Sequence, residues 1–272
     1  MSDPDIRWSF EPIILLALAS YGGVYWWRFR AARREADGRG AGAAQAIAFG
    51  VALLVLAAAL LSPVAALGEE RLFSMHMVQH VLLGDIAPAL ALLGLSRVIM
   101  RPATRRLMAI ERRLGALAHP LVFLGAWLAL IYVWHIPALY DAAATNDVLH
   151  VLEHGSFFAA GVLFWWPLIQ PVPMRRGLTG LWPFAYIAGG KALLGGLGVL
   201  LTWSGTAIYD HYAEAPRTWG LSAVEDQNLG GAIMMAEQSI VLVIAFAVLF
   251  VAMLGRSEED ERRRERLEEA AA

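Results

Sequence analysis

Long apolar stretches alternate with short charged segments along nearly the whole sequence. A transmembrane helix needs about 20 consecutive, mostly apolar residues, because lipid offers no hydrogen-bond partner to an open backbone. Stretches that meet this requirement lie near residues 12–29, 44–67, 75–95, 118–140, 149–171, 181–203 and 229–254. The pattern therefore predicts an all-α, polytopic membrane protein. We expect a bundle of seven transmembrane helices over residues 1–254, followed by a charged tail over residues 255–272.

Basic and acidic residues occupy alternate connections between these spans, and cytoplasmic loops of membrane proteins are the ones enriched in arginine and lysine. The connections after the first, third and fifth spans hold Arg28, Arg30, Arg33, Arg34, Arg39, Arg97, Arg101, Arg105, Arg106, Arg112, Arg113, Arg175 and Arg176. The opposite side holds Asp3, Asp5, Glu11, Glu69, Glu70, Asp141, Asp147, Asp210, Glu214, Glu225 and Asp226. We therefore expect the N-terminus outside the cell and the tail in the cytoplasm, where its mixed charges suit a short solvated helix.

Composition narrows the classes of function. The 272 residues are 58% hydrophobic and only 17% charged, which is too apolar for an ordinary soluble domain. A net charge of −2 argues against nucleic-acid binding. Cysteine is absent, so disulfides, thiolate zinc sites, iron–sulfur clusters and covalently attached c-type haem are excluded. A metal ion here must be held by histidine, methionine, carboxylate or backbone oxygen.

Two pairs of histidines open the third and fifth spans. The pairs are His76 and His80 in HMVQH, and His150 and His154 in HVLEH. On an α-helix, residues four apart share a face with about 6 Å between their Cβ atoms, so the ring nitrogens of a pair can converge on one ion. A lone histidine at a membrane interface is more often an anchor or a packing group. Two pairs at the same depth nevertheless favour an outward-facing metal site.

Further ligands lie at the same depth as these pairs. His135 ends the fourth span in WHIPALYD, where Pro137 is expected to stop the helix. Thioethers select Cu(I) among the metals that imidazole binds. Methionines beside the first pair or at the start of the seventh span are Met75, Met77, Met234 and Met235. Copper is therefore the first metal predicted, although each methionine taken singly is more often a core residue.

Three ionisable residues, Asp85, Lys191 and Glu237, lie deep inside the expected spans. Charge inside a bilayer is costly, so we expect these side chains to meet near mid-membrane and to pair. Their pairing would form an ion or proton path, a second metal-binding step further inward, or a structural salt bridge that locks the third, sixth and seventh spans. The structural salt bridge is the favoured interpretation.

The outer side carries further candidates for binding or acid–base chemistry. The long connection before the seventh span holds His211 and Asp226 and could cover the site. In an enzyme with a histidine and carboxylate metal site, Glu153, Asp141 or Asp226 would serve as acid–base groups. Paired helix histidines can also supply both axial ligands of a b-type haem. A chain of haems across the membrane would need histidines near both faces, and only His119 lies inward.

The stretches that hold these residues can be compared with known families. They are LSP from Leu61, HMVQHVLLGDIAPALALLG from His76, WHIPALYDAA from Trp134, HVLEHGSFFAAGVLFWWPL from His150 and DQNLGGAIMM from Asp226. Together they resemble the bacterial CtaG-type family of assembly factors for caa3-type cytochrome c oxidase, and the resemblance runs nearly end to end. It implies an integral protein of the bacterial inner membrane that helps to assemble a copper centre and is not itself an enzyme.

We therefore expect a copper-handling assembly factor whose site is centred on the two histidine pairs. The expected partners are cytochrome c oxidase subunits, the lipid bilayer and a periplasmic copper donor. Two alternatives remain open at this point. The chain could carry electrons through b-type haem, or it could scaffold oxidase subunits without binding any metal.

Overall fold

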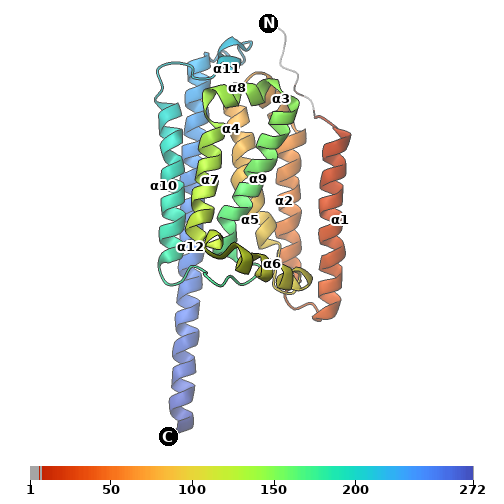
Figure 1. Ribbon diagram of the computed structural model, residues 1–272, viewed down its shortest axis with the longest axis vertical. Coiled ribbons are helices and arrows are strands. Elements are labelled where there is room, and N and C mark those ends of the chain that lie inside the picture. The colour runs from red at the N-terminus through yellow and green to blue at the C-terminus, as the bar shows by residue number, and fades with distance from the viewer. Residues whose placement is uncertain (1–5, 7, 272) are drawn as a thin grey trace.

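The computed structural model describes residue 6 and residues 8–271. Asp3 and Asp5 are two of the acidic residues that led us to expect the N-terminus outside the cell. Both lie outside the described residues. Every regular element within the described ranges is a helix, which confirms the predicted all-α class. Figure 1 shows long helices running side by side, with α1 beginning at one end of the bundle and α12 extending from the other.

Most of the elements are joined by short connections, and a longer one precedes α12. In chain order they are α1 (Pro12–Glu35), α2 (Ala43–Leu61), α3 (Pro63–Glu70), α4 (Phe73–Val81), the π-helix η1 (Leu82–Ile86), α5 (Ala87–Leu93), α6 (Arg101–Leu114), the 3₁₀-helix η2 (Gly115–Ala118), α7 (Pro120–Trp134), α8 (Pro137–Thr145), α9 (Asp147–Ile169), α10 (Trp182–Thr202), α11 (Asp210–Glu214) and α12 (Ala223–Ala271).

Among the residues that the structure describes, five helical segments are long and apolar enough to cross a membrane: α2, Phe73–Leu93, α9, α10 and Ala223–Gly255 of α12. A sixth arises only if Arg101–Ala118 and α7, bent by 74° at their junction, count as one span. By itself α7 has 15 residues, or about 22 Å against a hydrocarbon core of about 30 Å. α1 is not among the five, because tyrosine, tryptophan and arginine dilute its apolar residues. The helices thus support five or six spans where the pattern predicts seven.

Prolines decide where two of the helices begin. α2 ends at Leu61 and α3 begins at Pro63, so the stretch expected as one span over residues 44–67 contains a break. Proline lacks an N–H and clashes with a preceding helical turn, so it is favoured in the first turn of a helix. Ser62 caps α3 by accepting a backbone hydrogen bond at 3.2 Å. Pro137 likewise begins α8 after the end of α7.

The third apolar stretch is a continuous rod that contains the π-helical turn η1. A π-helix pairs each N–H with the carbonyl five residues back, so residues five apart lie nearly above one another. Asp85 in this turn and His80 at the end of α4 are five residues apart, and both line a cavity of about 30 Å³. Gly161 of α9 packs against this turn. A Cβ at Gly161 would collide with the carbonyl oxygen of Gly84 and lie 2.7 Å from Cγ of Pro88.

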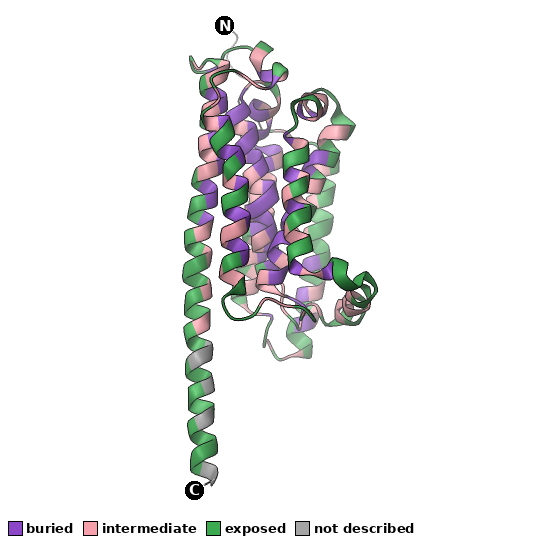
Figure 2. Ribbon diagram, turned by 60° about the vertical axis from the view of Figure 1, so that its left-hand side comes forward, coloured by how far each residue is buried: buried purple, intermediate pink, exposed green. Residues whose placement is uncertain are grey.

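The two ends of the bundle differ in chemistry. The arginine-rich end of α1 lies beside α6, and Arg28 donates hydrogen bonds of 2.8 Å to the carbonyl oxygens of Val98 and Ile99. α6 buries none of its side chains, and the tail continues α12 as an exposed helix (Figure 2). The opposite end carries α3, α8, α11 and the beginnings of α4 and α9 (Figure 1). The histidine pairs therefore lie away from the arginine-rich segments.

Candidate metal centre

Three histidines and one glutamate converge where α4 packs against the beginning of α9. One ligand atom from each of His76, His80, Glu153 and His154 lies within 4.8 Å of the others. The Nε2 atoms of His76 and His80 are 2.7 Å apart, and Nε2 of His80 lies 3.4 Å from Oε1 of Glu153. These four side chains, here called the ligand cluster, are between 1% and 9% exposed. α9 therefore contributes two consecutive residues to the cluster, where the sequence suggested its i, i+4 histidine pair.

The spacing and the donor atoms of the ligand cluster fit a transition-metal ion. Two ligand atoms that each lie about 2.1 Å from one ion are at most about 4.2 Å apart, so the 4.8 Å spread of these atoms must close by roughly half an ångström around an ion. In the part of the chain that the structure describes, Oε1 of Glu153 and Nε2 of His154 have no hydrogen-bond partner. Buried polar atoms without partners are destabilising. A bound cation would satisfy both atoms.

His150 and His135 flank the ligand cluster from two sides. The ring centroids of His150 and His154 are 4.1 Å apart, but Nε2 of His150 faces Oε1 of Glu69 at 3.9 Å. His135 follows the end of α7 and keeps its Nδ1 2.8 Å from a backbone carbonyl of that helix. Its ring centroid lies 5.7 Å from that of His80. Both residues are thus neighbours of the cluster and lie outside the group of four.

The four candidate methionines occupy different places. Met77 is fully buried in the core that α4 shares with α12, and Met235 packs on α10. Met75 is partly exposed near the start of α4. Met234 lines the cavity of about 30 Å³ together with His80 and His135. Met234 therefore lines the same cavity as two of the histidines, whereas Met77 and Met235 pack between helices.

The long connection before α12 folds over the ligand cluster. Nε2 of His211 lies 2.9 Å from the carbonyl oxygen of Glu69. Asp226, which the sequence placed in this connection, lies instead in the first turn of α12. Its carboxylate accepts hydrogen bonds of 2.6 and 3.2 Å from the first two backbone N–H groups of α4 and so caps that helix. Tyr209 and Tyr212 donate to backbone carbonyls at 3.1 and 2.6 Å. Burial raises the pKa of both tyrosines, so their hydroxyls stay protonated and keep donating.

The structure brings Asp85, Lys191 and Glu237 together inside the bundle. The Lys191 ammonium pairs with Oδ2 of Asp85 and lies 3.4 Å from Oε1 of Glu237. Trp165 donates to the other oxygen of Asp85 at 2.5 Å, and Gln238 donates to Glu237. This buried charge cluster joins η1, α10 and α12, and it holds two acids for one base.

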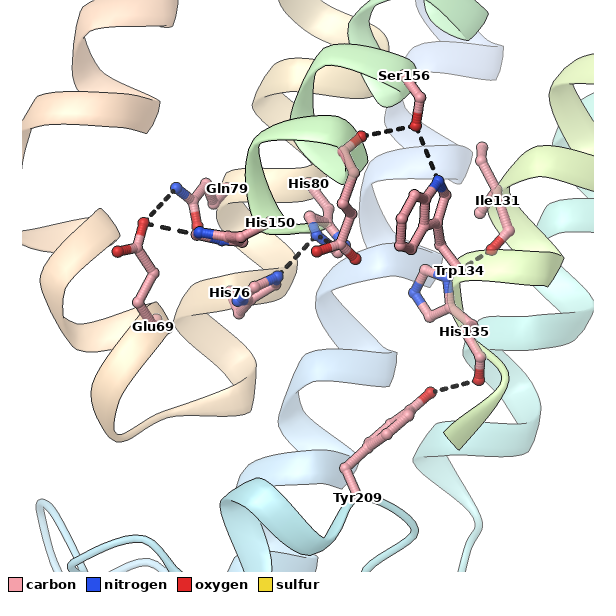
Figure 3. A network of polar contacts seen from close by, with 12 residues as sticks. Glu69, His76, Gln79, His80, Ile131, Trp134, His135, His150, Ser156 and Tyr209 are labelled. Atoms are coloured by element: carbon pink, nitrogen blue, oxygen red, sulfur yellow. Dashed lines mark hydrogen bonds and ion pairs between the residues drawn. The ribbon is translucent and has the colours of Figure 1, made fainter. Parts of the chain in front are cut away.

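Tyr140 and Gln79 line the site although the sequence did not single them out. Tyr140 is 1% exposed and its ring centroid lies 5.4 Å from that of His76. Gln79 donates to Oε1 of Glu69 at 3.3 Å, on the side where this carboxylate faces His150 (Figure 3). Burial raises the pKa of Glu69, and the hydrogen bond from Gln79 opposes that shift. A signal for both residues was present in the sequence, because each is a polar side chain inside a motif that holds candidate histidines: Gln79 in HMVQH and Tyr140 in WHIPALYD.

Comparisons with known proteins give one family and several relatives. A family profile described as "Cytochrome c oxidase caa3 assembly factor (Caa3_CtaG)" matches residues 23–256. Uncharacterized proteins of Mycobacterium bovis and Mycobacterium tuberculosis are each 28% identical over 266 residues, which is 89% of this chain and 39% of the relative. An uncharacterized protein of Mycobacterium leprae is 22% identical over 201 residues, which is 66% of this chain and 30% of the relative. No solved structure matches the chain.

The chain thus spans about two fifths of the length of the first two relatives. The family match, over residues 23–256, includes every residue of the ligand cluster and of the buried charge cluster. The chain therefore belongs to the cytochrome c oxidase caa3 assembly factor family.

Proposed function

We propose that the chain assists the assembly of cytochrome c oxidase by holding copper at the ligand cluster and passing it to an oxidase subunit. The convergence of four ligand atoms within 4.8 Å, from two adjacent helices, carries this proposal. Membership of an oxidase assembly family points to cytochrome c oxidase as the partner. Copper is one of the metals that imidazole binds well. Copper would be cargo that leaves by ligand exchange, so no catalytic turnover is needed.

We also infer seven spans, with the ligand cluster facing outward. α1 has 24 residues, or about 36 Å, which is enough to cross a bilayer, and α7 would cross together with the residues that flank it. The arginine-rich ends of α1 and α6 share one end of the bundle (Figure 1), and such segments stay in the cytoplasm. The opposite end would then face the periplasm of a bacterial inner membrane, within reach of a copper donor.

The two other readings of the histidines receive less support. The Nε2 atoms of His76 and His80 are 2.7 Å apart on one helix, so these rings do not stand on opposite faces of a haem. The cavity beside them has a volume of about 30 Å³, room for about two water molecules. A scaffold that binds no metal would leave unexplained why Glu153 and His154 are buried without hydrogen-bond partners for Oε1 and Nε2 among the described residues.

Metal analysis of the full chain, purified in detergent and loaded with Cu(I), tests the proposal. We expect one copper ion per wild-type chain. A variant carrying His76→Ala, His80→Ala, Glu153→Ala and His154→Ala should hold none, because no donor of the ligand cluster remains. The milder His80→Gln keeps the volume of the site and should weaken copper binding by at least about tenfold.

His119→Ala provides a matched control, because His119 caps the opposite end of α7. This variant should keep the copper content of the wild type. A quadruple variant that holds as much copper as the wild type, or a wild type that holds none, would contradict the proposal. Normal oxidase assembly in cells that carry the quadruple variant would then favour the scaffold.

A further inference from the structure

A line of polar side chains leads from the surface to the ligand cluster, and exposure falls along it. The side chain of Glu69 is 41% exposed and that of His150 is 19% exposed. The next histidines inward, His154 and His76, are 9% and 2% exposed. Side chains that can bind a cation therefore lie at successive depths between the solvent and the ligand cluster.

The steps along this line are short. Nε2 of His150 lies 3.9 Å from Oε1 of Glu69, and the two side chains point toward each other in Figure 3. The ring centroid of His150 is 4.1 Å from that of His154 and 5.8 Å from that of His76. Nε2 of His150 is buried without a hydrogen-bond partner in the described part of the chain. His150 can therefore reach Glu69 on one side and the ligand cluster on the other.

Aromatic rings cover two further sides of the ligand cluster. Tyr140 and Tyr212 lie 5.4 and 6.3 Å from His76, measured between ring centroids. Phe157 stacks on His80 at 4.2 Å. An aromatic wall offers few ligands to a hydrated cation, whereas the side lined by Glu69 and His150 offers an oxygen and a nitrogen.

We propose that Glu69 and His150 form a capture site, which takes up a copper ion from solution or a donor and passes it to His154 and His76. This inference rests on the proposed function. The transfer is ligand exchange: the ion keeps its oxidation state, and bonds to Glu69 and His150 break as bonds to the two inner imidazoles form. Two partly hydrated ligands bind more weakly than the four buried ones, so the ion moves inward.

The rate of copper loading tests the capture site, with a coloured Cu(I) chelate as donor and the full chain in detergent. Glu69→Gln keeps the shape of the side chain and removes its charge, and His150→Gln removes the imidazole. Each should slow loading by about tenfold. The residues of a capture site speed the entry of copper but do not bind it in the final site. Loading and release should therefore slow by the same factor, with one copper per chain and an unchanged Kd.

Glu70→Gln is the matched control, since Glu70 is an exposed neighbour on α3 and its substitution changes the net charge equally. It should load at the rate of the wild type. Normal loading by Glu69→Gln and His150→Gln, in a wild type that binds one copper, would overturn the capture site and leave the proposed function standing. Loss of the bound copper in either variant would also overturn it, by making that residue part of the final site. A wild type without copper would overturn both proposals.

Discussion

Lys191→Met is expected to destabilise the protein by about 3–5 kcal/mol, because it leaves two buried acids without their cation. Lys191 is the only lysine in the sequence and is 1% exposed. Its ammonium pairs with Asp85 and Glu237 and lies 5.5 to 5.8 Å from the ring centroids of three aromatic side chains. Thermal unfolding in detergent, followed by tryptophan fluorescence, would measure the loss.

The neutral triple variant Asp85→Asn, Lys191→Met, Glu237→Gln separates a structural role from a functional one. Replacing a whole buried ion group by neutral residues of similar volume is often close to neutral for stability. We expect this variant to regain most of the stability that Lys191→Met loses and to bind copper normally. A stable triple variant that no longer supports oxidase assembly would instead assign the charges to an ion or proton path. Wild-type stability in Lys191→Met would contradict the salt bridge.

Gly161→Ala is expected to destabilise the protein by about 1–3 kcal/mol through overpacking. The added Cβ would collide with the carbonyl oxygen of Gly84 and meet Cγ of Pro88 at 2.7 Å. Because backbone atoms cannot rotate away, α9 and η1 must separate. Glu153 and His154 lie on the same helix, so the distance between them and the α4 histidines should grow. Copper affinity should therefore fall together with the unfolding temperature.

Gly155→Ala is the control on the same helix. A Cβ there meets nothing within 4 Å, and alanine favours a helix over glycine by about 1 kcal/mol. This variant should be as stable as the wild type or slightly more stable, with unchanged copper binding. Equal behaviour of Gly155→Ala and Gly161→Ala would show that the contact between α9 and η1 does not set the geometry of the site.

Much of the architecture follows from properties of single segments. Lipid offers no hydrogen-bond partner to the backbone, so a segment in the membrane must form its own backbone hydrogen bonds. The runs of apolar residues therefore determined the helical class and the approximate positions of the helices. The break between α2 and α3 was harder to see, because Ser62 and Pro63 interrupt an otherwise apolar run. The number of spans also depends on more than apolarity, since α1 and α7 lie near the limits of hydropathy and length.

The sequence by itself determined that α4 presents His76 and His80 on one face, because four-residue spacing has that consequence on any α-helix. Only the tertiary structure decided that Glu153 joins them, while His150 faces Glu69. Consecutive residues on a helix point about 100° apart, so the choice depends on how α9 is rotated against α4. The tertiary structure likewise placed Asp85 and His80 on the wall of one cavity, because five-residue spacing shares a face in the π-turn η1 and not in an ordinary α-helix.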